Sequence, residues 1–260
     1  MGYYYGGRYI NNNALFRREL EDENSPKLSL NRFWNELLAG KMIVVMDTET
    51  TGLSAKDADV IEISAVKVRL APAGSKTPFV VLDTFDSYIN PGYELPAAIV
   101  EFNRKNGTGI CDEFLADKPN SATVAHELDA FFKKEPAVTE DCILVGHNQE
   151  AFDVPFIEKL MNAGGHSIPF QKTFDTYRYA KQIIPFAGKG THTLGTLHEK
   201  TEGIFSSSAS EGVAHTSIFD CLMTLDLVQH FTSELEKARP IPTEPDVQKK
   251  PVLKRIEHER

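Results

Sequence analysis

The 260-residue sequence lacks the features of membrane, secreted and lipid-anchored proteins. No hydrophobic run approaches the roughly 20 residues that a membrane-spanning helix needs. The first residues, MGYYYGGRYI, carry neither the basic flank and apolar centre of a secretory signal nor a complete myristoylation motif. We therefore expect a soluble, cytoplasmic protein with no membrane partner.

Cysteine and positive charge are also scarce. Cys111, Cys142 and Cys221 are far apart and form no CxxC pair, which argues against a disulfide framework and a structural zinc site. The chain has 28 Lys and Arg against 37 Asp and Glu, a formal net charge of −9. This balance argues against a protein that coats nucleic acid, but not against an enzyme that holds a few nucleotides at a metal site.

Glycine-rich phosphate loops are missing too. The segment DTETTGL, which follows the first apolar strand, contains only Gly52, so it does not carry a dinucleotide-binding fingerprint. A P-loop is also absent, because Gly188-Lys189 is followed by Gly190 and position 183 is Ile. Two common routes to nucleotide binding are thereby excluded.

Composition divides the chain into three parts. Residues 1–40 are predicted to form a flexible arm, rich in Tyr, Asn and charge, that ends in a short amphipathic helix over Ser29–Leu38. Residues 41–235 contain the periodic apolar segments of a folded domain. Residues 236–260 are Pro-rich and charged, and we interpret them as a flexible tail.

The folded domain begins with strands and continues with helices. Apolar, β-branched runs predict strands over 42–50, 60–70, 79–89 and 142–148. Helical spacing of apolar residues predicts helices over 121–134 (with Ser121 as N-cap), 152–163, 176–183, 193–201 and 216–236. Three meandering strands followed by α–β–α indicate a mixed sheet covered by helices, an α/β sandwich.

Four acids and one histidine lie beside these apolar elements. Asp47 and Glu49 end the first strand, where alternation places residues i and i+2 on one face. Asp153 begins a helix, and His215 and Asp220 bracket the start of the last helix. Each residue taken singly is more simply a cap, a turn former or a structural hydrogen-bonding group.

Charge favours a joint role for the four acids. Carboxylates that converge raise one another's pKa and cannot all ionise without cations. DTETTGL, HNQEAFD and HTSIFD contain no Lys or Arg that could supply a structural ion pair. Hard divalent cations, Mg²⁺ or Mn²⁺, prefer such oxygen ligands. If the segments converge, they form a metal site.

The same segments carry a family resemblance. DTE at 47–49, HNQEAFD at 147–153 and HTSIFD at 215–220 resemble, in order and separation, the three motifs of the DnaQ-like (DEDDh) 3′→5′ exonucleases. The resemblance covers roughly residues 42–232 and implies a ribonuclease H-like fold with a mixed five-stranded sheet flanked by helices. Proofreading subunits of replicative DNA polymerases are similar, although they often carry His-Gly-Ile where this chain has Thr108-Gly109-Ile110.

The resemblance implies a mechanism and a site. Two divalent ions would be held by Asp47, Glu49, Asp153 and Asp220, and His215 would take a proton from the attacking water. The turn that follows the first strand would hold the terminal nucleotide, with a further polar contact from the second motif. The substrate-binding candidates are Thr50, Gly52, Leu53 and Asn148.

The expected substrate is the 3′ end of single-stranded DNA or RNA, with DNA proofreading or repair favoured and nucleoside 5′-monophosphates as products. Three alternatives remain open at this point: an exoribonuclease or oligoribonuclease of the same fold, a non-catalytic module that docks on a polymerase, and, more remotely, a metallophosphatase. A polymerase or another protein could be a partner through the terminal segments.

Overall fold

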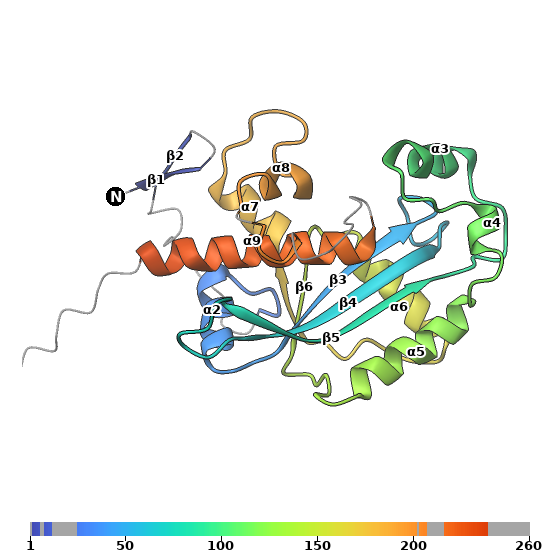
Figure 1. Ribbon diagram of the computed structural model, residues 1–260, viewed down its shortest axis with the longest axis horizontal. Helices are drawn as coiled ribbons and strands as arrows, with labels where there is room; N and C mark the ends of the chain where they lie inside the picture. Colours follow the sequence, from blue (N-terminus) through green and yellow to red (C-terminus); the bar gives the residue numbers. More distant parts are fainter. Residues whose placement is uncertain (1, 6–7, 12–24, 202, 207–215, 239–260) are drawn as a thin grey trace, which may run out of the picture.

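A mixed five-stranded sheet forms the centre of the protein (Figure 1). The computed structural model describes residues 2–5, 8–11, 25–201, 203–206 and 216–238. The strand order is β5-β4-β3-β6-β7, in which β3, β4 and β5 are antiparallel neighbours and β6 and β7 run parallel to β3. The strands are β3 (Ile43–Thr50), β4 (Val60–Leu70), β5 (Phe79–Tyr88), β6 (Ile143–Gly146) and β7 (Lys172–Asp175).

The central strand β3 explains why the sheet has two covered faces. Its side chains alternate between two hydrophobic clusters: Ile43 and Val45 enter one, and Val44 and Met46 enter the other. All four are almost fully buried. A strand that is buried on both sides reads in sequence as a continuous apolar run, and here the run MIVVM ends where Asp47 begins the polar end of the strand.

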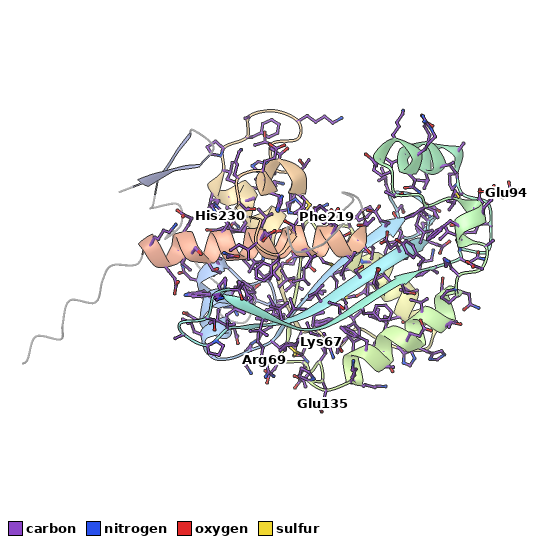
Figure 2. The ribbon with its side chains drawn as sticks, in the orientation of Figure 1. Lys67, Arg69, Glu94, Glu135, Phe219 and His230 are labelled. Carbon is purple, nitrogen blue, oxygen red and sulfur yellow. The ribbon has the colours of Figure 1, made fainter. Side chains whose placement is uncertain are left out.

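Helices cover both faces (Figure 1). One cluster joins the sheet to α2 (Leu30–Leu38), α7 (Thr176–Ile183), α8 (Leu194–His198) and α9 (Ser217–Ala238). The other joins it to α5 (Ser121–Lys133) and α6 (Asp153–Ala163). On the α5 side lies the buried Lys67 (Figure 2), whose ammonium donates to three backbone carbonyls at 2.7–3.0 Å.

The expected elements are confirmed apart from their ends. β4 and α7 have the predicted bounds, and α2, α5, α6 and α9 differ from prediction by one or two residues at an end. The N-cap of α5 was predicted wrongly: Asn120, and not Ser121, accepts a hydrogen bond from Thr123 N at 3.0 Å. Either side chain can cap a helix, so sequence alone could not place the first turn.

Within the predicted folded domain, three elements were not expected from local patterns: α3 (Ala97–Asn106), α4 (Asp112–Leu115) and β7. β7 has only four residues and no alternation, and it became recognisable only through its pairing with β6. α3 and α4 lie beside the start of β4, where Ile61, Leu95, Ile110 and Leu115 form a small cluster of their own. They therefore stand at the same end of the sheet as Asp47 and Glu49.

The N-terminal part holds more structure than expected. β1 (Gly2–Tyr5) and β2 (Arg8–Asn11) pair as an antiparallel hairpin, and two Tyr-rich segments around a Gly-Gly dipeptide were a signal for it in the sequence. α2 is anchored in the core by Phe33, Trp34 and Leu37. The domain boundaries at 40 and 236 remain a prediction, and residues 239–260 of the tail lie outside the described part.

The described helices also include none that is both long and apolar enough to cross a membrane.

Candidate active site

Three carboxylates converge beside the carboxyl end of β3. Asp47 and Glu49 continue the face of Val45, which is the face that α9 covers, and Asp220 comes from the first turn of α9. One oxygen from each of these three carboxylates lies within 4.8 Å of the other two. Residues 171 and 173 positions apart in sequence are thus brought to ligand-sharing distance by the packing of α9 on the sheet.

Asp153 reaches the same end of the sheet from the opposite face. It is the first residue of α6 and is 3% exposed. Its Oδ1 accepts hydrogen bonds from the backbone N of Thr48 at 3.0 Å and from the Thr48 hydroxyl at 2.7 Å. Thr48 points to the α6 side of the sheet, and Asp47 and Glu49 point to the α9 side. The end of β3 therefore contacts Asp153 of α6 on one face and lies beside Asp220 of α9 on the other.

Burial and mutual repulsion shift the pKa values of these acids upward. Burial, followed by the charges of Asp153 and Asp220, raises the pKa of Asp47 well above its usual range. Burial and the charge of Asp220 raise the pKa of Glu49 to about 9. Burial raises the pKa of Asp153 to about 6, while the two Thr48 hydrogen bonds act in the opposite direction. The cluster therefore resists carrying its full negative charge at neutral pH.

Three of these acids form no ion pair with a basic side chain among the described residues. None of the Lys, Arg or His ion pairs found there involves Asp47, Glu49 or Asp153. A donor set made entirely of carboxylate oxygens fits a hard divalent ion such as Mg²⁺ or Mn²⁺. The chemistry of the cluster is thus compatible with the metal site expected from sequence.

The acidic region extends further along the sheet than the sequence motifs indicated. Glu62 on β4 lies directly opposite Glu49 and is fully buried. Burial and the charge of Asp86 on β5 raise its pKa to about 7. Glu62 was missed because VIEIS was interpreted only as a strand; an acid in an otherwise apolar buried strand was the available signal.

A chain of hydroxyls fixes the start of α9 to the sheet. Ser64 on β4 donates to Asp86 Oδ1 at 2.8 Å, and its Oγ lies 2.6 Å from the Oγ of Ser217. Ser217 lies three residues before Asp220, so this contact helps to position that carboxylate. Sequence reasoning missed this link as well.

His215 lies outside the described residues, so its predicted role stays a prediction. The residues closest to it that the structure describes are Thr216 and the first turn of α9, where Asp220 N donates to Thr216 O at 3.0 Å.

The turn after β3 is held together by its own polar groups. The Thr50 hydroxyl donates to Gly52 O at 2.7 Å, and the Thr51 hydroxyl lies 2.8 Å from the Tyr93 hydroxyl. A methyl group added at Gly52 would lie 3.1 Å from Ala58 Cβ, so Gly52 packs closely against Ala58 and a larger residue would have to displace it. Leu53 is 90% exposed and free to contact a ligand.

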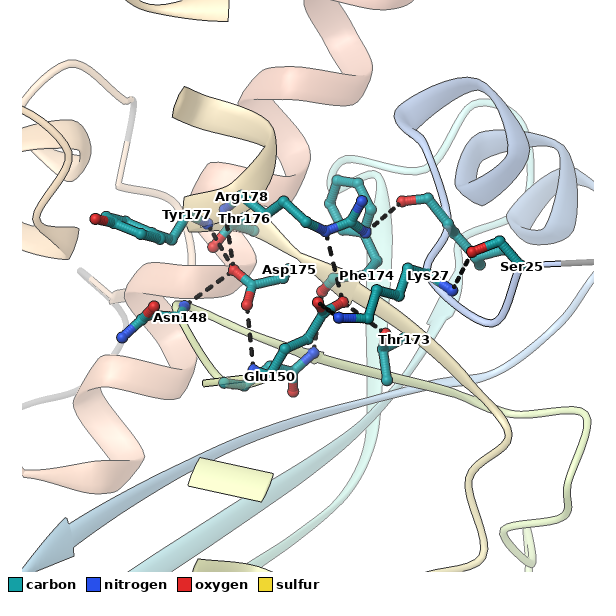
Figure 3. A network of polar contacts seen from close by, with 12 residues as sticks. Ser25, Lys27, Asn148, Glu150, Thr173, Phe174, Asp175, Thr176, Tyr177 and Arg178 are labelled. Carbon is teal, nitrogen blue, oxygen red and sulfur yellow. Dashed lines mark hydrogen bonds and ion pairs between the residues drawn. The ribbon is translucent and has the colours of Figure 1, made fainter. Parts of the chain in front are cut away.

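Asn148, the fourth substrate candidate, follows β6 with a left-handed backbone (φ 66°). Its N–H donates to Asp175 Oδ1 at 3.0 Å, and its side-chain amide points away from that carboxylate (Figure 3). Positive φ is uncommon outside glycine, and such backbones concentrate at functional sites. The four predicted substrate residues thus lie along the ends of the neighbouring strands β3 and β6.

Comparison with known proteins agrees with this geometry. The model of the RNase_T family, described as Exonuclease, matches residues 44–228. The chain is 36% identical over 168 residues to a PolC-type DNA polymerase III from Bacillus cereus, and 35% identical over 159 residues to one from Streptococcus pyogenes. These matches cover 65% and 60% of the chain but only 10% and 9% of the relatives, so the chain spans about a tenth of their length.

Solved structures give the same fold. A structure of Escherichia coli exonuclease I with single-stranded DNA and a zinc ion superposes with a TM-score of 0.55 at 14% identity, over 76% of this chain and 42% of that chain. Exonuclease I in complex with a dT13 oligonucleotide gives a TM-score of 0.55 at 15% identity, over 76% and 43%. At this level of identity the likeness establishes the ribonuclease H-like fold.

Proposed function

The chain belongs to the RNase_T exonuclease family, and on that basis we propose that it is a metal-dependent 3′→5′ exonuclease acting on single-stranded DNA. The observation that carries the proposal is that carboxylate oxygens of Asp47, Glu49 and Asp220 lie within 4.8 Å of one another. The charge of Asp153 also raises the pKa of Asp47 and Glu49, and no cation partner for Asp47, Glu49 or Asp153 is found among the described residues. DNA is favoured over RNA because PolC-type polymerases and exonuclease I–DNA complexes are among the similar proteins.

The carboxylates would hold two divalent ions. By the family resemblance, Asp47, whose carboxylate interacts with the charges of the other three acids, would serve both ions. Glu49 and Asp220 would complete one site, and Asp153 would hold the second. Bound there, two such ions stabilise charge on the attacking and the leaving oxygen of an in-line displacement at phosphorus. The remaining task for the protein is to orient the strand end and to move protons.

His215 is the proposed general base. An imidazole that titrates near neutral pH suits the removal of a proton from the attacking water. We expect His215→Ala to lower kcat by roughly 10²–10⁴-fold while Mn²⁺ binding, measured by calorimetry, survives. A variant that is inactive because it no longer binds Mn²⁺ would contradict this division of labour.

The turn after β3 is the proposed holder of the terminal nucleotide. Leu53 would pack against the base, which accounts for a large apolar side chain left 90% exposed. Because Leu53 makes little contact with the protein, Leu53→Ser should leave stability within about 0.5 kcal/mol of the parent. The KM for an oligonucleotide should nevertheless rise several-fold.

Digestion of 5′-labelled single strands tests the function directly. With Mn²⁺, a labelled DNA 20-mer should give a ladder that shortens from its 3′ end, with nucleoside 5′-monophosphates released. An RNA strand of the same sequence tests for an exoribonuclease, which would shorten the RNA in preference to the DNA. A strand blocked at its 3′ end serves as the control. Absence of cleavage of any strand with Mg²⁺ or Mn²⁺ would favour a non-catalytic docking module instead.

A polymerase partnership remains a prediction. It was expected to involve the terminal segments, most of which lie outside the described residues.

A further inference from the structure

A groove of about 410 Å³ lies at the carboxyl ends of β6 and β7 and shares no lining residue with the acid cluster. Its walls come from three places in the chain: Lys27 before α2, Asn148 after β6, and Tyr177 and Lys181 on α7. The volume lies within the range of sites that enclose small ligands. There is room for a nucleotide unit.

The N-terminal segment builds one of these walls. Thr173 N on β7 donates to Pro26 O at 2.8 Å, and Leu28 N donates to Thr173 O at 2.8 Å, so residues 26–28 run beside β7. Leu28 is buried. Because the family match begins only at residue 44, this wall is contributed by residues outside the matched domain.

The two acids in the groove are matched by internal partners (Figure 3). Asp175 accepts hydrogen bonds from the backbone N–H groups of residues 148, 150, 177 and 178. Glu150 accepts the Thr173 hydroxyl, pairs with Lys27 at 2.8 Å and lies 3.5 Å from Arg178 Nε. Lys27, Arg178 and Lys181 together outnumber these two carboxylates, so the groove is suited to an anion.

A ring and a cation lie together on α7. The Lys181 ammonium lies 5.0 Å from the centre of the Tyr177 ring, and no ion pair involving Lys181 occurs within the described part of the chain. The Tyr177 ring packs edge-on against His147 at 5.5 Å. Figure 3 shows Tyr177 pointing away from the Asp175 network. Positive groups combined with aromatic rings are typical of single-strand binding surfaces, where rings stack on bases and cations contact phosphates.

The groove and the proposed active site lie at the same end of the sheet, beside the carboxyl ends of β7, β6 and β3. Asn148 lines the groove, and Asp153 lies five residues further along the same segment. β7 is two strands away from β3, about 10 Å at the usual strand spacing. A strand whose 3′ end reaches the carboxylates can therefore pass over the groove.

We propose that this groove is a second nucleotide subsite, which binds an internal nucleotide of the single strand through a base stacked on Tyr177 and a phosphate held by Lys181 and Lys27. The inference rests on the proposed exonuclease function. It assigns a substrate-binding role to the segment before α2, and it predicts that strands long enough to reach the groove bind better than a dinucleotide.

The test compares substrates of two lengths in the full chain. With Mn²⁺, Tyr177→Ala and Lys181→Ala should each raise the KM for a (dT)8 strand about tenfold, the size of one lost base stack or phosphate contact, with kcat little changed. Kinetics on the dinucleotide dTpdT should not change. Tyr177→Phe should behave like the parent, and Lys76→Ala, an exposed lysine between β4 and β5, is the matched control.

A cross-linking experiment separates this inference from the function itself. A (dT)8 strand that carries one internal 5-iodouracil is irradiated with the full chain in EDTA, and the modified residue is identified by mass spectrometry. Attachment to Tyr177 supports the subsite even if no strand is hydrolysed. Unchanged (dT)8 kinetics in all variants, together with no cross-link on Tyr177, overturn it while leaving the exonuclease activity intact.

Discussion

Two strand ends of the same sheet, those of β7 and β3, carry carboxylates with opposite surroundings. At β7, Asp175 receives four backbone N–H groups and Glu150 pairs with Lys27, so both acids are satisfied within the protein. At β3, Asp47 and Glu49 face further acids, and their pKa values are raised by burial and by the neighbouring acids. Carboxylates with internal partners stabilise a fold, whereas carboxylates without them are available to a metal ion.

Asp47→Asn should have the largest effect on activity. Loss of metal-ion catalysis is worth several kcal/mol, so we expect kcat to fall at least about 10³-fold. The metal-free protein should be no less stable than the parent, because a source of repulsion has been removed. Activity on a labelled DNA strand and urea unfolding in EDTA check both parts, with the exposed Asp141→Asn as control. A clear loss of stability in EDTA would mean that Asp47 is a structural acid like Asp175.

Asp175→Ala should show the reverse behaviour. It removes the N-cap of α7 and leaves buried N–H groups without an acceptor, which should cost about 2–4 kcal/mol of unfolding free energy. The stabilisation of the protein by Mn²⁺ should survive, as a thermal shift measured with and without Mn²⁺ would show. Loss of that shift would indicate that the two regions are not independent.

The pH dependence of stability should differ with and without metal. The folded-state pKa of Glu49 is raised from 4.5 to about 9. Between these values the folded protein holds more protons than the unfolded chain, so the metal-free protein should lose stability as pH rises from about 5 to about 9. Melting temperatures in EDTA should follow this trend, and added Mg²⁺ should stabilise most at high pH. Glu49→Gln should flatten the profile; an equally steep profile would assign the slope to other groups.

Thr48→Val should have the smallest effect, because Asp153 has some internal hydrogen-bond partners but no cation partner. In this variant Asp153 loses the hydrogen bond from the Thr48 hydroxyl at 2.7 Å but keeps the one from the backbone N of residue 48 at 3.0 Å. The pKa of Asp153 should rise, since the lost bond favoured the charged form. We expect metal affinity to weaken about tenfold, in line with roughly 1.5 kcal/mol, the lower end of the range for a hydrogen bond to a charged group. Calorimetric titration with Mn²⁺ measures this, and unchanged affinity would mean that Thr48 has only a packing role.

Much of the fold could be predicted because local patterns were strong. β4 and α9 have long periodic sequences, and their bounds were predicted to within two residues. β7 was missed because four residues carry no usable period, and α3 because its apolar pattern is weak. The resemblance to DnaQ-like exonucleases supplied the fifth strand that local patterns could not.

The candidate site divides in the same way. Sequence alone determined that Asp47 and Glu49 share a face, because strand alternation is a local rule. Tertiary structure decided that Asp220 joins them, that Thr48 hydrogen-bonds Asp153, and that Glu62 extends the acidic region. It also decided that Glu150 and Asp175 lie beside cations and N–H donors. Whether a carboxylate is paired depends on which distant segments pack against it, and that is set by the burial of apolar faces over the whole chain.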